Sequence, residues 1–307
     1  MTNAWPPLTY AGWSDSKETL HMWTQIVGKV RMLKTPPVNH WWHVPLYVTS
    51  KGLGTSPIPD NERTFEIDFD FLDHNLCITT SDGDRRAFAL RPMTVADFYG
   101  RFMGALSELH IEAPIHTTPS EVADPIPFEK DTTHASYDAE AIARFWQALV
   151  SVCQVLARFR SEFIGKVSPV HFFWGGFDVA VTRFSGRLAP PHAEVPGLPL
   201  QIVREAYSHE VSSVGFWPGG NGAEAAFYAY AYPEPAGFDK ATAQPAAAFY
   251  SPEMGEFLLP YESVRTSNTP EEDIMNFARS TYEAAADLAQ WPRAELERGY
   301  KPSSAIT

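Results

Sequence analysis

The chain has 307 residues, of which 44% are hydrophobic and 20% charged, and its formal net charge at neutral pH is −13. This composition is typical of a globular protein, and the acidic charge argues against binding to the phosphates of nucleic acids. Two cysteines do not make a disulfide framework. The sequence has no leader-like apolar segment and no run of about 18 apolar residues, so we expect a cytoplasmic protein that does not bind membranes.

The first half of the chain alternates between helical and strand-like patterns. Apolar residues at helical spacing predict a helix over 17–33, which Pro36-Pro37 would end. Aromatic and β-branched residues over 40–49 predict a strand. Strands are also expected over 64–71, 75–80 and 85–90, followed by a helix over 95–110. Thr94 and Asp97 resemble a capping box at the start of that helix.

The second half begins after residues 111–133, in which four prolines stand among acidic residues and predict a linker. A long helix is expected over 137–163. Strands are expected over 170–174, 177–184, 209–217, 225–232 and 256–261, with a Pro-rich loop over 189–199. A last helix over 270–290 would start at Thr269, with Pro270 in its first position and Glu272 as the partner in a capping box.

Two short segments resemble each other. Residues 26–42 read IVGKVRMLKTPPVNHWW and residues 163–174 read FIGKVSPVHFFW, so that His40 corresponds to His171. Short motifs of common residues also recur by chance, but here the order of helix, antiparallel strands and helix recurs as well. We therefore predict an α+β fold built from an internally duplicated unit, with helices packed on antiparallel sheet. The units would span 1–112 and 136–307, joined by a Pro-rich linker over 113–135 and paired as one pseudo-two-fold body.

Four longer strings add a resemblance: NHWWHVPLYVT, FEIDFDF, SPVHFFWGGFDVAVTRFSGR and YSHEVSSVGFWPGG. They resemble an uncharacterised bacterial family that is defined as a domain of unknown function. The resemblance covers nearly the whole chain. It implies no substrate, catalytic residue or cofactor, so the candidate site has to be derived from the residues themselves.

Several histidines stand beside aromatic or acidic residues. His40 and His43 flank a Trp pair, His171 precedes Phe172, and His209 adjoins Glu210. One interpretation is a metal site in which His43 or His40, His171, His209 and Glu210 bind a divalent metal such as Zn, Fe or Mn. A second is metal-free catalysis, with His171, His209 and Glu210 as acids and bases. In the third, the histidines are buried and only structural. No HExxH or paired CxxC motif decides between them.

Other residues of the same segments fit a ligand pocket. Asp178 and Arg183 would orient a histidine or hold a ligand, or else form a structural ion pair. The predicted ligand-binding residues, besides these two, are His40, Trp41, Trp42, His43, Phe172, Phe173, Trp174, Phe216 and Trp217. Their aromatic rings would line a cavity for a small molecule or would simply fill the core.

Two further patterns favour structural interpretations. Glu66, Asp68 and Asp70 alternate with apolar residues. They could bind a cation, but the pattern favours the solvated face of a strand opposite Arg85, Arg86 or Arg91. Neither Gly-Lys-Val motif is a phosphate-binding loop, because Val stands where Ser or Thr should follow the lysine.

Three functions therefore compete at this point. The first is an enzyme that acts on a small organic molecule by acid–base or metal-assisted chemistry. The second is a non-catalytic protein that binds a small ligand, and the third is a structural or interaction protein. The aromatic residues with nearby His and Glu side chains favour the enzyme.

Overall fold

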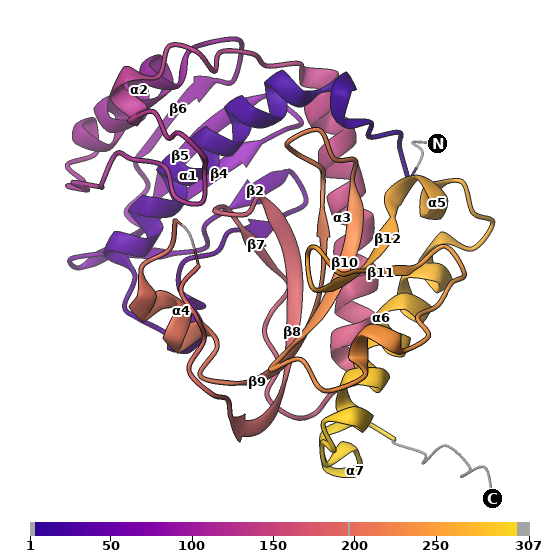
Figure 1. Ribbon diagram of the computed structural model, residues 1–307. Helices are drawn as coiled ribbons and strands as arrows, with labels where there is room; N and C mark the ends of the chain where they lie inside the picture. The colour runs from indigo at the N-terminus through magenta and orange to yellow at the C-terminus, as the bar shows by residue number, and fades with distance from the viewer. Residues whose placement is uncertain (1–3, 196, 300–307) are drawn as a thin grey trace, which may run out of the picture.

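The computed structural model describes residues 4–195 and 197–299 and has an α+β fold (Figure 1). Residues 1–3 and 300–307 of the predicted units, and residue 196 of the predicted loop, lie outside this description. The main helices are α1 (Ser14–Lys34), α2 (Val95–Glu108), α3 (Ala139–Ser161), α4 (Leu200–Ala206), α5 (Tyr261–Arg265), α6 (Pro270–Leu288) and α7 (Arg293–Leu296). Within the described residues, no helix combines the length and apolar character needed to cross a membrane.

The first sheet is antiparallel and is covered by α1 and α2. Its strands are β1 (Tyr47–Val48), β2 (Gly52–Gly54), β3 (Ile58–Asp60), β4 (Arg63–Asp70), β5 (Asn75–Thr80) and β6 (Arg85–Ala89). They run in the order β1-β2-β4-β5-β6, with β3 also paired to β4. The ring of Phe98 in α2 stacks on Trp23 of α1 at 4.7 Å and on Phe69 of β4 at 6.3 Å. The predicted alternation over 64–71 is confirmed, because Phe65, Ile67 and Phe69 are all buried.

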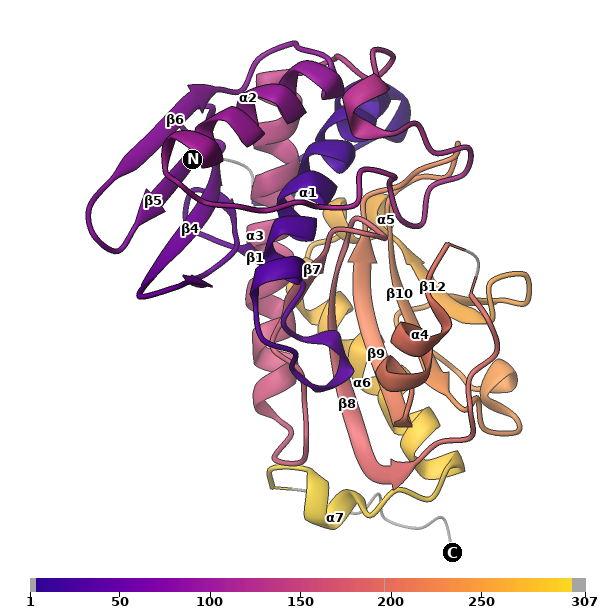
Figure 2. The same ribbon diagram turned by 90° about the vertical axis from the view of Figure 1, so that its left-hand side faces the viewer.

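The second sheet is also antiparallel, in the order β11-β12-β10-β9-β8-β7. Its strands are β7 (His171–Phe173), β8 (Asp178–Leu188), β9 (His209–Trp217), β10 (Ala226–Tyr232), β11 (Phe249–Ser251) and β12 (Glu256–Pro260). Figure 2 shows α6 behind this sheet and α4 in front of it. Because side chains alternate along a strand, β8, β9 and β10 each send one set toward α3 or α6 and the other toward the face where α4 lies.

The two sheets meet at their edges. The N–H of Leu46 donates to the carbonyl of Phe172 (2.9 Å), and the N–H of Phe172 donates back to Leu46 (2.8 Å). Beneath this junction the ring of Phe177 packs on Phe145 of α3 at 5.3 Å and on Phe172 at 5.2 Å. One cluster of buried apolar side chains extends from Trp5 to Trp291. The junction therefore brings the segment that follows α1 to the edge of the second sheet.

The predicted internal duplication is not confirmed. Gly28-Lys29-Val30 lies inside α1, whereas Gly165-Lys166-Val167 follows the end of α3 outside any helix. The strand orders of the two sheets also differ. Similar residues thus adopt different conformations, because neighbouring segments rather than the short motif decide the local structure.

The predicted strand over 40–49 is mostly wrong. Only Tyr47–Val48 is a strand, while residues 39–41 form a 3₁₀ turn in which His40 and Trp41 have φ of 58° and 61°. Such positive φ values are unusual for residues with bulky side chains, so the surrounding structure must hold this turn. The sequence also gave no sign of β2, β3, β11 or α4.

The helix caps were predicted with mixed success. The hydroxyl of Thr94 accepts the N–H of Asp97 at 3.0 Å, as expected. Pro270 begins α6, but the Thr269 side chain makes no capping hydrogen bond.

The expected acidic face of β4 is not solvated throughout, nor is it paired with the β6 arginines. Asp70 is buried, 3.4 Å from Lys51, and accepts the N–H groups of Leu72 and Asp73. Strand β5 lies between β4 and β6, and Arg86 binds Glu108 instead.

Candidate functional site

A cavity of about 1000 Å³ lies between the second sheet and α4. Its floor consists of alternate residues of four strands. These are Asp178, Ala180, Thr182 and Phe184 of β8, Val211, Ser213 and Trp217 of β9, Ala226, Tyr228 and Tyr230 of β10, and Glu256 and Leu258 of β12. The cavity exists because α3 and α6 cover only the other face, and its size suits a small organic molecule.

Segments distant in sequence form the walls of the cavity. From the N-terminal part come Lys29, Met32, His40, Trp41, Trp42 and Val44, and from the predicted linker come His116 and Thr118 to Glu121. Phe173 and Trp174 follow from the end of β7, and Ile202, Ala206 and Tyr207 come from α4 and the residue after it. The Trp174 indole N–H donates to the Val44 carbonyl at 2.9 Å, which links the wall to the junction between the sheets. Aromatic side chains thus surround a few polar groups.

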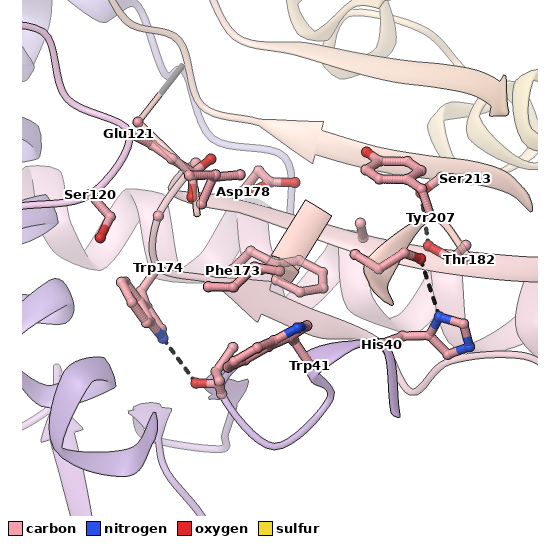
Figure 3. A pocket seen from close by; sticks show the side chains of 18 of the residues that line it. His40, Trp41, Ser120, Glu121, Phe173, Trp174, Asp178, Thr182, Tyr207 and Ser213 are labelled. Atoms are coloured by element: carbon pink, nitrogen blue, oxygen red, sulfur yellow. Dashed lines mark hydrogen bonds between the residues drawn. The ribbon is translucent and has the colours of Figure 1, made fainter. Parts of the chain in front are cut away.

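Three carboxyl groups share one end of the cavity. Figure 3 shows Glu121 and Asp178 together at this end, with His40 at the other. Desolvation raises the pKa of Asp178 to about 6. Glu121 stays accessible from the cavity, but the surrounding protein displaces bulk water, and this desolvation with the Asp178 charge raises its pKa to about 7. The same two causes raise the pKa of Glu256 to about 7. These groups therefore exchange protons near neutral pH.

Tyrosines of β10 hold the carboxyl end in place. The Tyr228 hydroxyl donates to Oδ2 of Asp178, an interaction that opposes the rise in the Asp178 pKa. A Cβ on Gly215 would lie only 2.3 Å from the Tyr228 ring, so the absence of a side chain there makes room for Tyr228. Tyr230 shares a hydrogen bond of 3.0 Å with Tyr207, just beyond α4. The floor is thus ordered by contacts among its own polar groups.

His40 lies at the opposite end of the cavity, beside Lys166. Its Nδ1 is 3.1 Å from the carbonyls of both Glu205 and Ala206, which can only accept, so the proton belongs on Nδ1. Nε2 is then free to accept a hydrogen bond from the Lys166 ammonium at 2.5 Å. Burial and the charge of Lys166 lower the pKa of His40. His40 is therefore held neutral in a fixed orientation.

The predicted catalytic residues lie outside the set that lines the cavity. His171 is fully buried, next to Trp42 and Tyr47, and burial with the nearby Arg31 lowers its pKa to about 3. His209 lies beside His40, with ring centroids 5.6 Å apart. Glu210 points to the other face of β9, where it accepts hydrogen bonds from Ser185 and Arg187.

The predicted metal ligands do not come together. His171 pairs through Ala180 with Gly215, six residues from His209 along β9, a separation of roughly 20 Å. His43 accepts the N–H of Val38 at Nδ1. Across residues 4–195 and 197–299, no three His, Cys, Asp or Glu side chains are arranged to hold a metal ion.

The remaining predicted ligand-binding residues divide between the two faces of the second sheet. Trp41, Trp42, Phe173, Trp174, Asp178 and Trp217 line the cavity together with His40. Phe172 and Phe216 lie in the core. Arg183 is buried on the helical face, where its guanidinium packs on Phe159 and Tyr282 and donates to the Phe159 carbonyl. Arg183 and Asp178 therefore do not act on a common group.

Comparison with known proteins adds a family but no activity. The model of a family of unknown function, DUF5996, matches residues 5–298. The chain belongs to the DUF5996 family. No curated protein and no solved structure matches it.

Several polar groups of this DUF5996 cavity were missed at the level of sequence. Tyr228 and Tyr230 alternate in AFYAYAY and could have been placed on one face of a strand. Glu256 stands at the start of a predicted strand. Glu121 and Lys29 gave no signal of their own, since one lies in the presumed linker and the other in a helix that looked purely structural.

Proposed function

We propose that this protein is an enzyme that binds a small organic molecule in the cavity and transfers a proton to or from it. The observation that carries the proposal is the group of Asp178, Glu121 and Glu256, whose pKa values lie near neutrality inside an aromatic cavity. A group that changes protonation near the working pH is suited to general acid–base catalysis.

Asp178 is the strongest candidate for the proton-transferring group. It begins β8, which is paired on both sides within the sheet, so its position is fixed by the fold and by the Tyr228 hydroxyl. Glu121 and Glu256 both interact electrostatically with it, so loss of one proton makes loss of the next less favourable. The three groups can therefore share a proton that a bound substrate takes or supplies.

Non-catalytic binding of a small ligand is the second candidate. Trp174, Phe173 and Trp41 form an aromatic wall, and the paired hydroxyls of Tyr207 and Tyr230 offer hydrogen bonds. Such a surface binds ligands without needing any proton transfer. The two candidates differ in whether the ligand is recovered unchanged.

The test combines a thermal-shift screen with product analysis. Compounds that raise the melting temperature are incubated with the protein and examined by mass spectrometry. The enzyme proposal expects turnover that Asp178→Asn abolishes while binding persists, and that Glu210→Gln, on the other face of the sheet, leaves intact. Ligands recovered unchanged would favour the binding function, and the absence of any stabilising compound would count against both.

A further inference from the structure

Lys29 is an unusual member of the cavity lining. It is only 4% exposed, yet it faces the cavity. Its ammonium donates to the Ser120 hydroxyl at 3.2 Å and lies 6.0 Å from the Trp174 ring. Among the residues that the structure describes, no carboxylate forms an ion pair with it. By contrast, the ammonium of Lys34 on the same helix forms an ion pair with Oδ1 of Asp60 at 2.7 Å.

A buried ammonium without a counterion is unfavourable. Burial lowers the pKa of Lys29, and no ion pair with a carboxylate among the described residues offsets the lost hydration of its ammonium. The carboxyl groups of Glu121 and Glu256 interact with that of Asp178 instead. A negatively charged group that enters the cavity would supply the missing counterion and so bind favourably to the Lys29 ammonium.

The surroundings of Lys29 are preorganised. A Cβ on Gly28 would lie 2.3 Å from the Trp174 ring, so the indole packs directly on the backbone of α1 beside Lys29. Ser120 is fixed to the same helix by Gln25, which accepts the Ser120 N–H at 2.7 Å and donates to its carbonyl at 2.8 Å. Both polar groups are therefore in place before a ligand arrives, which reduces the entropy lost on binding.

We infer that Lys29 and Ser120 bind the carboxylate of an organic acid whose apolar part lies against Trp174 and Phe173. A single negative charge matches the Lys29 ammonium, the only Lys or Arg side chain among the described residues that line the cavity. The three carboxyl groups that share the cavity would repel a doubly charged phosphate more strongly than a singly charged carboxylate. The Ser120 hydroxyl accepts from Lys29 and can donate its own proton to a carboxylate oxygen. This inference rests on the proposed function and specifies the substrate class.

Matched acids and esters test the inference. The probes are benzoate, phenylacetate, indole-3-acetate and 1-naphthoate, each compared with its methyl ester by calorimetry and thermal shift. We expect the wild type to bind at least one acid roughly tenfold more tightly than its ester, the usual effect of one charged hydrogen bond. In Lys29→Met this preference should disappear while ester binding stays the same. Lys130→Met, at an exposed site, should leave the preference intact.

The stability of Lys29→Met without ligand separates ligand binding from a structural role. Removal of an uncompensated buried charge should leave the melting temperature unchanged or raise it. A lower melting temperature, with acid and ester binding weakened equally, would show that Lys29 only supports the fold and would overturn the inference. Preferential binding of esters by the wild type would also overturn it but leave the proposed function standing. If neither acids nor esters bind, both the inference and the proposed pocket fail for this class of ligand.

Discussion

The Asp178→Asn substitution should stabilise the folded protein at alkaline pH. Desolvation raises the pKa of Asp178 to about 6 from the ordinary 3.8, so the folded state holds its proton more tightly than the unfolded state. The stability that this proton contributes is complete below about pH 4 and is lost as the pH rises through about 6. Asparagine is never ionised, so the loss should not occur in the variant.

The expected magnitude follows from the size of the shift. About two pKa units correspond to roughly 3 kcal/mol, which is an upper value because Asp178 interacts with Glu121 and Glu256 and is reached by water in the cavity. The side-chain carbonyl of asparagine can still accept the hydrogen bond from the Tyr228 hydroxyl, so the substitution removes little favourable interaction. We expect a net gain of about 1–2 kcal/mol in the free energy of unfolding near pH 8 and almost none near pH 4.

Urea unfolding of wild type and variant at both pH values measures this difference. Asp73→Asn, at an exposed position on the turn between β4 and β5, is the matched control and should show no pH-dependent gain. Equal destabilisation of Asp178→Asn at both pH values would refute the reasoning, because it would mean that folding does not raise the pKa of Asp178.

Further predictions concern the contacts around Asp178 and Trp174. In Tyr228→Phe the carboxylate of Asp178 loses the hydrogen bond from the hydroxyl, so the pKa of Asp178 should rise by up to about one unit. NMR of the carboxyl carbon measures this pKa, and a lower pKa in the variant would contradict the role given to the Tyr228 hydroxyl. Gly28→Ala should lower the free energy of unfolding by about 1–3 kcal/mol in chemical denaturation, because the new methyl group overlaps the Trp174 ring. Gly104→Ala in α2 has open space around its new Cβ and should instead stabilise by about 1 kcal/mol, so equal effects of the two substitutions would count against the packing argument.

Features that depend on local sequence patterns were predicted reliably. Strict alternation in TFEIDFDF identified β4 and the buried face formed by Phe65, Ile67 and Phe69. Thr94 was recognised as a helix cap because its hydrogen bond spans only three residues. These features depend on neighbours in the chain, so periodicity and spacing suffice to predict them.

The site was only partly predictable, since alternation shows which side chains share a face but not what covers it. Phe216 and Trp217 are adjacent on β9, yet Phe216 packs in the core and Trp217 lines the cavity. For the same reason, the sequence did not reveal that Asp178 and Arg183 lie on opposite faces of the sheet, as do His209 and Glu210. Helices α3 and α6 cover one face of the sheet, and only their position decides which set of side chains faces the cavity.

From the sequence we could predict the α+β fold class with its antiparallel strands, and the few segments in which aromatic residues and histidines are concentrated. Only the folded structure places Glu121, from a stretch without regular secondary structure, at the same end of the cavity as Asp178 and Glu256. The same holds for Lys29, which faces this cavity from a helix. The physical reason is that the pKa and the binding capacity of these groups come from desolvation and from charges on distant segments. Such effects arise only when the chain has folded.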